Sequence, residues 1–184
     1  MDHAPSHHDD LLDVTEPDVA DLLADEQEGG APARRRALVV LINDHPDAGD
    51  PGLERLIADV LAEENFLVGG VVQVESEEGR IREAIETAVV GGVDVVLTIG
   101  GTGVGPRDVA PEATRSVIDR DIPGIAEAMR RAGLGAQALD AMTSRGVAGI
   151  SGSTVVVNVA GSRAAVRCSL AASAPLIHYV VEQL

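Results

Sequence analysis

The sequence predicts an α/β fold, a three-layer α/β/α sandwich around a mostly parallel sheet with one antiparallel strand. Apolar β-branched runs alternate with segments of helical periodicity as far as residue 99. The chain is 45% hydrophobic but has one Phe, one Tyr and no Trp, so its core must consist of Val, Ile, Leu and Ala, which suits a parallel sheet between helices. A hairpin signal, Ser151-Gly152-Ser153, separates two late apolar runs and supplies the antiparallel strand.

The individual elements follow from these patterns in chain order. Runs rich in Val, Ile and Leu predict strands at residues 37–42, 66–74, 93–99, 147–150 and 154–159. Helical spacing predicts helices at residues 53–64, 79–90, 125–132 and 164–184. A further short helix is expected to open at Pro111, because proline suits the first turn and Glu112 complements the helix dipole there.

The composition changes near residue 33. Residues 1–33 hold ten of the thirty acidic residues and no Arg, whereas residues 34–184 hold twenty acidic residues and fourteen Arg, a net charge of −6. This imbalance predicts a disordered acidic tail at 1–33, followed by one domain at 34–184. A capping-box pattern at Thr15-Glu16-Pro17-Asp18 leaves a docking helix open as the alternative. The tail is also a candidate arm for a protein partner.

The composition excludes several classes of function. The chain has no Lys, which excludes a P-loop lysine, a lysine Schiff base and a lysine general base. A net charge of −16 leaves no basic footprint for nucleic acid, and the single Cys168 supports neither a disulfide framework nor a cysteine metal site. No apolar run reaches the roughly 18 residues of a membrane span and the acidic N-terminus is no signal peptide, so we expect a cytoplasmic protein without membrane contact.

The stretch after the third predicted strand carries the strongest signal of a site. It reads Gly100-Gly101-Thr102-Gly103 and, four residues further on, Asp108. Ligands of open α/β sheets bind beyond the carboxyl ends of the strands. Three glycines in four positions permit positive φ and let backbone N–H groups approach an anion, most often a phosphate. Asp108 adds an oxygen ligand for Mg²⁺, so the loop predicts a site for nucleotide phosphates.

Longer phrases around this loop resemble those of a known family. G-G-T-G, four residues, Asp and then V-x-P-E-A-T is similar to the signature of the MoaB/Mog family of molybdenum cofactor biosynthesis proteins, which includes the gephyrin G domain and the molybdopterin adenylyltransferases. Residues 144–150 and 158–162 also look like family segments. The resemblance covers roughly residues 36–182 and is closest to the actinobacterial MoaB2-type branch. It implies the MogA/MoaB-like molybdopterin-binding fold and a homotrimer, or a hexamer of paired trimers.

The resemblance also implies a reaction, in which ATP and molybdopterin give adenylylated molybdopterin and pyrophosphate with Mg²⁺. Asp108 would then hold Mg²⁺ or position the phosphate nucleophile of the pterin. The residues expected to bind phosphate are Gly100, Gly101, Thr102 and Gly103, and those expected to shape the pterin side are Ser144, Arg145, Gly161 and Ser162. The guanidinium of Arg145 suits a pterin phosphate, but it suits one of the many carboxylates of the chain equally well.

One departure from the family pattern concerns the metal. Ser76 stands where adenylyltransferases of the family place an essential Asp, and a hydroxyl does not hold Mg²⁺ as a carboxylate does. Glu75 or Glu77 is the candidate substitute, although both also suit the N-terminus of the helix that follows.

Further departures affect the loops. Ala160 and Arg163 replace the two prolines of the family phrase N-L-P-G-x-P, which removes rigidity and adds a cation able to meet a phosphate or close the site. The first loop keeps only Asp50-Pro51-Gly52 of the phrase D-x-S-G-P. Together with Ser76, these changes favour an alternative function, a catalytically weakened scaffold or regulatory protein that acts through protein–protein contacts.

Overall fold

The computed structural model describes residues 34–44 and 50–184. The predicted tail at 1–33, with its capping-box pattern, lies outside these residues, so the division at residue 33 stays a prediction. The described residues form a six-stranded sheet of order β2-β1-β3-β6-β5-β4. Its strands are β1 (Arg35–Ile42), β2 (Phe66–Val74), β3 (Val95–Ile99), β4 (Arg120–Asp121), β5 (Ala148–Ser151) and β6 (Thr154–Val159).

The strand directions confirm the predicted mixed sheet. Strands β2, β1, β3 and β6 pair in parallel, and β5 pairs antiparallel with β6. The two-residue strand β4 adds antiparallel to β5, so β5 is the one strand that runs against the rest. The β5–β6 hairpin turns at Gly152, which has a φ of +58°. This positive φ explains why glycine suits the turn.

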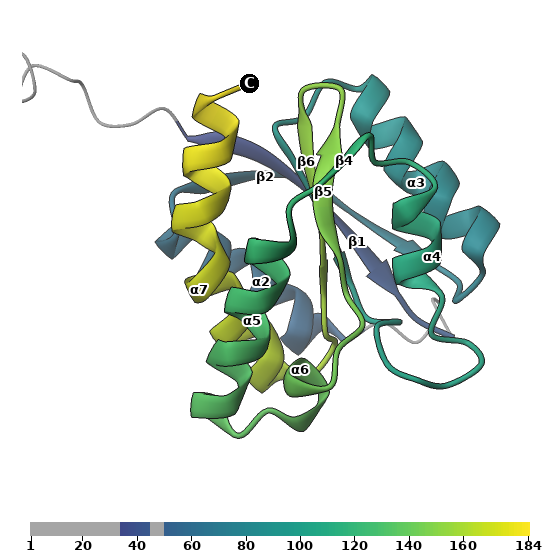
Figure 1. Cartoon of the computed structure of the whole chain (residues 1–184), viewed down its shortest axis with the longest axis vertical. Coiled ribbons are helices and arrows are strands. Elements are labelled where there is room, and N and C mark those ends of the chain that lie inside the picture. The colour runs from purple at the N-terminus through teal and green to yellow at the C-terminus, as the bar shows by residue number, and fades with distance from the viewer. Residues whose placement is uncertain (1–33, 45–49) are drawn as a thin grey trace, which may run out of the picture. The chain divides into compact units, whose positions relative to one another are not determined.

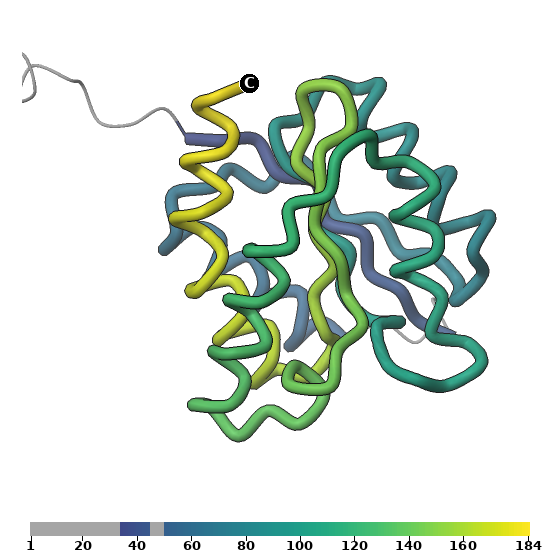
Figure 2. Tube along the Cα trace, in the orientation of Figure 1, coloured from purple at the N-terminus to yellow at the C-terminus, as the bar shows by residue number. Residues whose placement is uncertain are grey.

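Helices cover both faces of the sheet, as the sequence predicts. Figure 1 shows α2 (Pro51–Glu63), α5 (Pro123–Ala136) and α7 (Arg163–Glu182) on one face. The opposite face carries α3 (Glu78–Val90) and α4 (Ala110–Arg115), while the short α6 (Leu139–Met142) follows α5. The wide connection between β3 and α4 is visible at the lower right of Figure 2.

The core consists of two layers that share the strands. Val39, Leu97 and Val157 face the α2, α5 and α7 layer, whereas their neighbours Val40 and Val96 face the α3 and α4 layer. This alternation is the period of two expected of strands that are buried on both faces. It confirms the three-layer sandwich.

The C-terminal helix α7 is the longest helix of the described part. By length and composition alone it is apolar enough to cross a membrane. In the structure Val166, Leu170 and Ile177 are buried in the larger core layer. An apolar helix of this kind is ordinary in the core of an α/β domain.

Two short elements differ from the prediction, and several helix and strand ends are displaced by one to four residues. Neither β4 nor α6 is predicted, because two and four residues are too short to show a period. The helix predicted to end at residue 132 continues as α5 to Ala136. It passes through Gly133, where an added Cβ would lie 2.7 Å from the Ala141 Cβ, so this glycine serves close packing rather than ending the helix.

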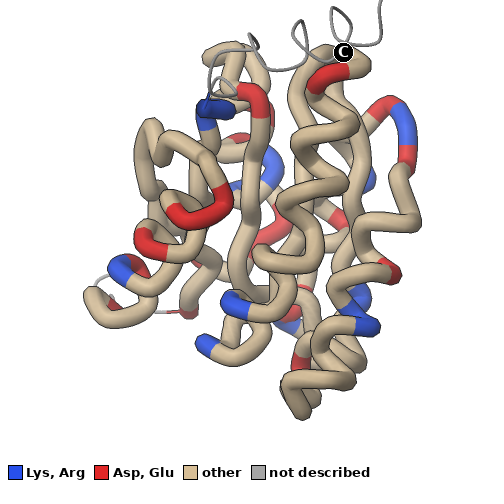
Figure 3. Tube along the Cα trace, turned by 90° about the vertical axis from the view of Figure 1, so that its left-hand side faces the viewer, with Lys and Arg blue, Asp and Glu red and all other residues tan. Residues whose placement is uncertain are grey.

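Charged positions are mixed along the trace. Figure 3 shows Arg positions interspersed with Asp and Glu positions over the described domain.

Candidate functional site

Three separate segments meet at one edge of the sheet. The glycine loop, which we define as residues 100–108, follows β3, and Gly161 follows β6. Because β5 is antiparallel to β6, the residues before β5, Ser144 and Arg145, reach the same edge. A Cβ on Gly161 would lie 3.3 Å from the Gly100 Cα, and the Arg145 N–H donates to the Thr102 carbonyl at 2.9 Å. The structure therefore brings the residues predicted for the phosphate and pterin sides to one place.

The first two glycines of the loop need to be glycine. Gly100 has a φ of +101° and Gly101 a φ of +64°. An added Cβ on Gly100 would lie 2.7 Å from the Ile42 carbonyl oxygen, a backbone atom that cannot yield easily. The Gly100 N–H donates to the Val159 carbonyl at 2.9 Å, so this amide already has its acceptor. Within the described residues the amides of Gly101, Thr102 and Gly103 have no acceptor, which leaves them to bind an anion.

The carboxylate of Asp108 lies folded over the same loop. Its Oδ2 accepts the Gly105 N–H at 2.8 Å, and a Cβ on Gly103 would lie 2.6 Å from this oxygen. The later glycines therefore make room for the carboxylate. The remaining oxygen, Oδ1, has no protein donor among the described residues and is available to a ligand.

Asp108 alone offers too few oxygen ligands for Mg²⁺, so the site fits this ion only if phosphate oxygens of a ligand complete the coordination. No group of three or more His, Cys, Asp or Glu side chains gathers anywhere in residues 34–44 and 50–184. Mg²⁺ accepts such a site, because it is commonly held by one or two carboxylates, substrate phosphates and water. Glu75 and Glu77 are both exposed, and no contact joins either of them to Asp108 in the described structure.

Arg145 holds the loop together. Its Nε donates to the Gly103 carbonyl at 2.6 Å, and its Nη2 donates to the Asp108 carbonyl. Its Nη1 pairs with the Glu112 carboxylate at 2.6 Å. Of the two partners that the sequence allowed for Arg145, a pterin phosphate or a carboxylate, the structure shows the carboxylate of Glu112. Through its bonds to Gly103 and Asp108, Arg145 positions the loop that carries Asp108.

The Glu112–Arg145 pair is expected to give a contribution to stability that depends on pH. The hydrogen bond from Arg145 holds the pKa of Glu112 below its ordinary value of 4.5. A carboxyl group with a lowered pKa in the folded state adds stability above the ordinary pKa, and this stability is lost as the pH falls below it. The hydrogen bond to Glu112 also raises the pKa of Arg145, which therefore stays charged throughout this range.

We therefore expect Glu112→Gln to be less stable than the wild type near pH 7, with the difference shrinking below about pH 4.5. Gln keeps an acceptor for Arg145 but removes the titrating group. Urea unfolding of both proteins at several pH values between 3.5 and 7 measures this difference. A difference that stays constant over the whole series would show that the ionisation of Glu112 has no part in it.

A buried hydrogen-bond network around Asn158 joins the segments next to the glycine loop. The fully buried Asn158 donates through Nδ2 to the Oγ1 atoms of Thr98 and Thr114, at 2.8 and 2.6 Å. Its Oδ1 accepts the Val147 N–H at 3.1 Å. These bonds tie β3, β6, α4 and the segment before β5 into one unit, because each partner belongs to a different segment.

The two serines predicted for the pterin side already have protein partners. The Ser162 hydroxyl caps α7 by accepting the Ala165 N–H at 3.1 Å, and it donates to the Asp140 Oδ1 at 2.8 Å. The Ser144 Oγ accepts the Gly146 N–H at 3.0 Å. Both serines therefore fix the shape of their loops in this structure.

Sequence reasoning missed the partner of Arg163. Its Nη2 lies 3.0 Å from both carboxylate oxygens of Asp50. Asp50 also caps α2 by accepting the N–H groups of Gly52 and Leu53, at 3.0 and 3.1 Å. The hydrogen bond from Arg163 is the main cause of the lowered pKa of Asp50. The arginine that replaces a family proline thus ties the loop after β6 to the start of α2.

A small cavity of about 100 Å³ opens between these segments, lined by Asp50, Gln73, Gly100 and Gly161 among others. The Gln73 Nε2 donates to the Glu54 carboxylate at 2.7 Å, while its buried Oε1 has no partner among the described residues. A buried acceptor without a donor is costly, so this oxygen suits a donor on a ligand or a water molecule. In the sequence, this residue could have been noticed because Gln73 is the one polar residue in the predicted strand 66–74.

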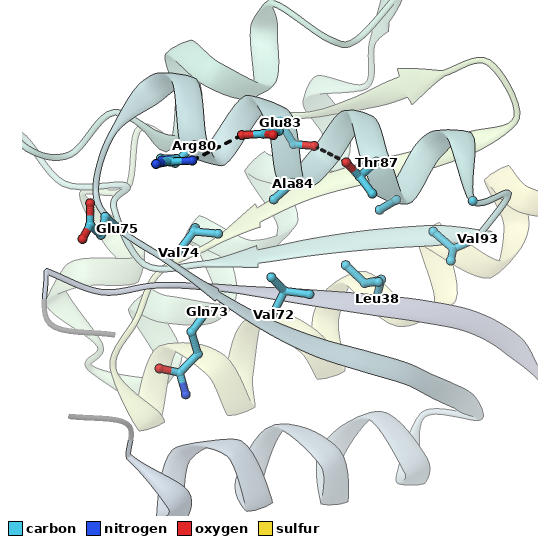
Figure 4. A pocket seen from close by; sticks show the side chains of 12 residues that line it. Leu38, Val72, Gln73, Val74, Glu75, Arg80, Glu83, Ala84, Thr87 and Val93 are labelled. Atoms are coloured by element: carbon cyan, nitrogen blue, oxygen red, sulfur yellow. Dashed lines mark hydrogen bonds and ion pairs between the residues drawn. The ribbon is translucent and has the colours of Figure 1, made fainter. Parts of the chain in front are cut away.

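A larger cavity, of about 550 Å³, lies elsewhere. Figure 4 shows it between the β1–β2 edge of the sheet and α3, with apolar side chains such as Leu38 and Val72 and a rim that includes Glu75 and Arg80. None of the glycine-loop residues lines it. Because convergent polar groups mark a functional pocket, the glycine loop remains the better candidate site.

A glycine loop with one carboxylate, beyond the carboxyl ends of parallel strands, is typical of α/β proteins that bind phosphate-containing ligands. A family model described as a probable molybdopterin binding domain matches residues 53–179. The chain belongs to this family, the MoaB/Mog family of molybdenum cofactor biosynthesis proteins.

Individual relatives agree with this assignment. A molybdopterin biosynthesis protein of Mycobacterium abscessus is 55% identical, with a TM-score of 0.77 over 81% of this chain and 95% of that one. This likeness gives partial support to the actinobacterial branch. The molybdenum cofactor biosynthesis protein B of Bacillus cereus is 34% identical over 79% of this chain and 87% of its own length. A molybdopterin adenylyltransferase of Helicobacter pylori is 39% identical over 48% of this chain and 50% of its length.

Some relatives are much longer than the matched region. The chain spans 22% of the Drosophila melanogaster protein cinnamon and 47% of a bifunctional molybdenum cofactor biosynthesis protein of Synechococcus elongatus.

Proposed function

We propose that the chain binds molybdopterin at the glycine-loop edge and adenylylates it with Mg·ATP. The observation that carries the proposal is the pairing of unengaged amides at residues 101–103 with the Asp108 carboxylate in one loop. A relative that bears the name molybdopterin adenylyltransferase supports the same reaction.

The chemistry asks mainly for positioning and charge neutralisation. An oxygen of the molybdopterin phosphate attacks the α-phosphorus of ATP, the new P–O bond forms, and the bond to the β-phosphate breaks to release pyrophosphate. Gly101, Thr102 and Gly103 donate their amides to the nucleotide phosphates in this proposal, and the positive φ of Gly100 forms the turn that precedes them. Mg²⁺ held by Asp108 would neutralise charge on the phosphate oxygens.

The pterin side is assigned to the loops that flank the glycine loop. Ser144 and Gly161 lie at the same edge of the sheet, and Ser162, directly after Gly161, is the N-cap of α7. Arg145 acts through Gly103 and Asp108, whose carbonyl groups it holds, so it is a positioning residue in this proposal.

The second candidate function is a scaffold or regulatory protein of the same fold. One observation favours it. Ser76 supplies no carboxylate, and the exposed Glu75 and Glu77 make no contact with Asp108 in the described structure. A site with a single carboxylate has less charge to hold Mg²⁺ than one with two.

We further propose that the protein works in the cytoplasm as a homotrimer or hexamer. The edge strand β2 supports an oligomer, because Leu67, Val71 and Val72 are 49%, 40% and 42% exposed. Exposed apolar side chains on an unpaired edge strand are a liability that another subunit would remove.

Calorimetric titration of the full chain with molybdopterin tests the binding part of the proposal. We expect saturable micromolar binding, which corresponds to about 8 kcal/mol. The matched comparison is a titration with AMP and no pterin, which reports the nucleotide side alone. The proposal would be contradicted if molybdopterin did not bind even at concentrations about 100-fold above this micromolar range.

A further inference from the structure

A cavity with an unusual concentration of arginine lies beside the candidate site. It has a volume of about 390 Å³ and lies between the N-terminal halves of α2 and α7. Its lining includes Arg55, Arg163 and Arg167, with Asp59 as the one acidic residue. The domain at 34–184 has twenty acidic residues and fourteen Arg, so a cavity lined by three arginines and one carboxylate runs against its overall charge.

Local pairing does not explain these arginines. Arg163 pairs with Asp50, but Arg55 and Arg167 are exposed and make no ion pair or hydrogen bond within the described residues. Helix stability does not explain them either. Arg163 is the first residue of α7 and Arg167 lies one turn later, where the positive end of the helix dipole disfavours cations. An anion in the cavity would remove both the mutual repulsion of the arginines and the repulsion from the helix.

The arginine cavity is next to the glycine loop. Gly161, which lies against Gly100, precedes Arg163 by two residues. Asp50 lines the small cavity beside Gly100, and its partner Arg163 lines the arginine cavity. The Arg163–Asp50 pair therefore links the two cavities, since each partner lines one of them.

We propose that the arginine cavity binds a diphosphate group, either the β- and γ-phosphates of the nucleotide or pyrophosphate itself. Guanidinium groups suit this ligand because their planar donors match phosphate oxygens in pairs. The assignment to the nucleotide rests on the proposed adenylylation. The affinity for inorganic pyrophosphate does not, because it depends on the arginines alone.

Titration of the full chain with sodium pyrophosphate tests the proposal. We expect Arg55→Gln and Arg167→Gln each to weaken binding about tenfold, since each removes charge-assisted hydrogen bonds to phosphate. The matched control is Arg131→Gln, which removes the same charge from an exposed position on α5 outside the cavity. The control is expected to bind like the wild type. Equal affinity in all four proteins, or no binding by the wild type, would overturn the proposal.

Titrations with ATP and AMP distinguish the two sources of the diphosphate. A nucleotide source predicts that Arg55→Gln and Arg167→Gln weaken ATP binding about tenfold and leave AMP binding unchanged. A shift for pyrophosphate alone supports a site for the free anion. Adenylylation with arginine-independent pyrophosphate binding overturns this inference and leaves the proposed function intact. If pyrophosphate binding depends on the arginines but the chain does not bind molybdopterin, this inference is supported and the proposed function is overturned.

Discussion

Replacement of Gly100 by alanine is expected to destabilise the domain by about 3 kcal/mol and to abolish ligand binding at the glycine loop. The backbone at Gly100 has a φ of +101°, which is strained for any residue with a side chain. The new Cβ would also lie 2.7 Å from the Ile42 carbonyl oxygen, at the end of the neighbouring strand. Relief of this clash would separate β1 from the loop and misplace the amides that follow. Urea unfolding measures the stability.

Gly152 provides the matched control. It has a φ of +58° in the β5–β6 turn, and a Cβ there would meet nothing within 4 Å. Gly152→Ala is therefore expected to cost only the backbone strain, about 1 kcal/mol, and to leave ligand binding unchanged. Equal losses of stability in the two variants would mean that the contact with Ile42 has no energetic weight.

Asp108→Asn is expected to reduce pyrophosphate release by at least about 100-fold while leaving the fold intact. An Asn oxygen can still accept the Gly105 N–H that Oδ2 of Asp108 accepts at 2.8 Å, so the loop keeps its shape. The variant loses the negative charge, which Mg²⁺ and the phosphate groups require nearby. The initial rate of release under saturating molybdopterin and Mg·ATP measures the effect.

Asp119→Asn is the corresponding control. Asp119 is an exposed carboxylate that, like Asp108, accepts a glycine amide, the Gly152 N–H at 2.9 Å, but it lies beside the β5–β6 turn. This variant is expected to release pyrophosphate at the wild-type rate. Asp108→Asn with full activity would remove Asp108 from the chemistry. Equal loss in both variants would point to a general effect of the substitution on the fold.

The sequence alone predicted the layers of the fold because its periods are clear. The run 93–99 and the glycines after it predict a buried strand that leads into a ligand loop, and β3 ends at Ile99 directly before Gly100. The strands predicted at 66–74 and 154–159 have the same bounds in the structure. Hydrophobic period and local turn chemistry were sufficient for these elements.

The pairs that shape the site were beyond the reach of the sequence. Arg145 and Glu112 are 33 positions apart, and Arg163 and Asp50 are 113 apart. Each arginine had several acidic candidates, and only the folded chain selects one of them. The unpaired Oε1 of Gln73 could not be predicted for the same reason, since the residues around it come from strands and loops far away in the sequence.

The most direct test of the proposed adenylylation is the release of pyrophosphate by the wild-type chain supplied with both molybdopterin and Mg·ATP. We expect release that requires both substrates and yields one pyrophosphate for each molybdopterin consumed. Omission of Mg²⁺ is expected to stop the reaction. Binding of molybdopterin without any release would contradict adenylylation and favour the scaffold or regulatory function of the same fold.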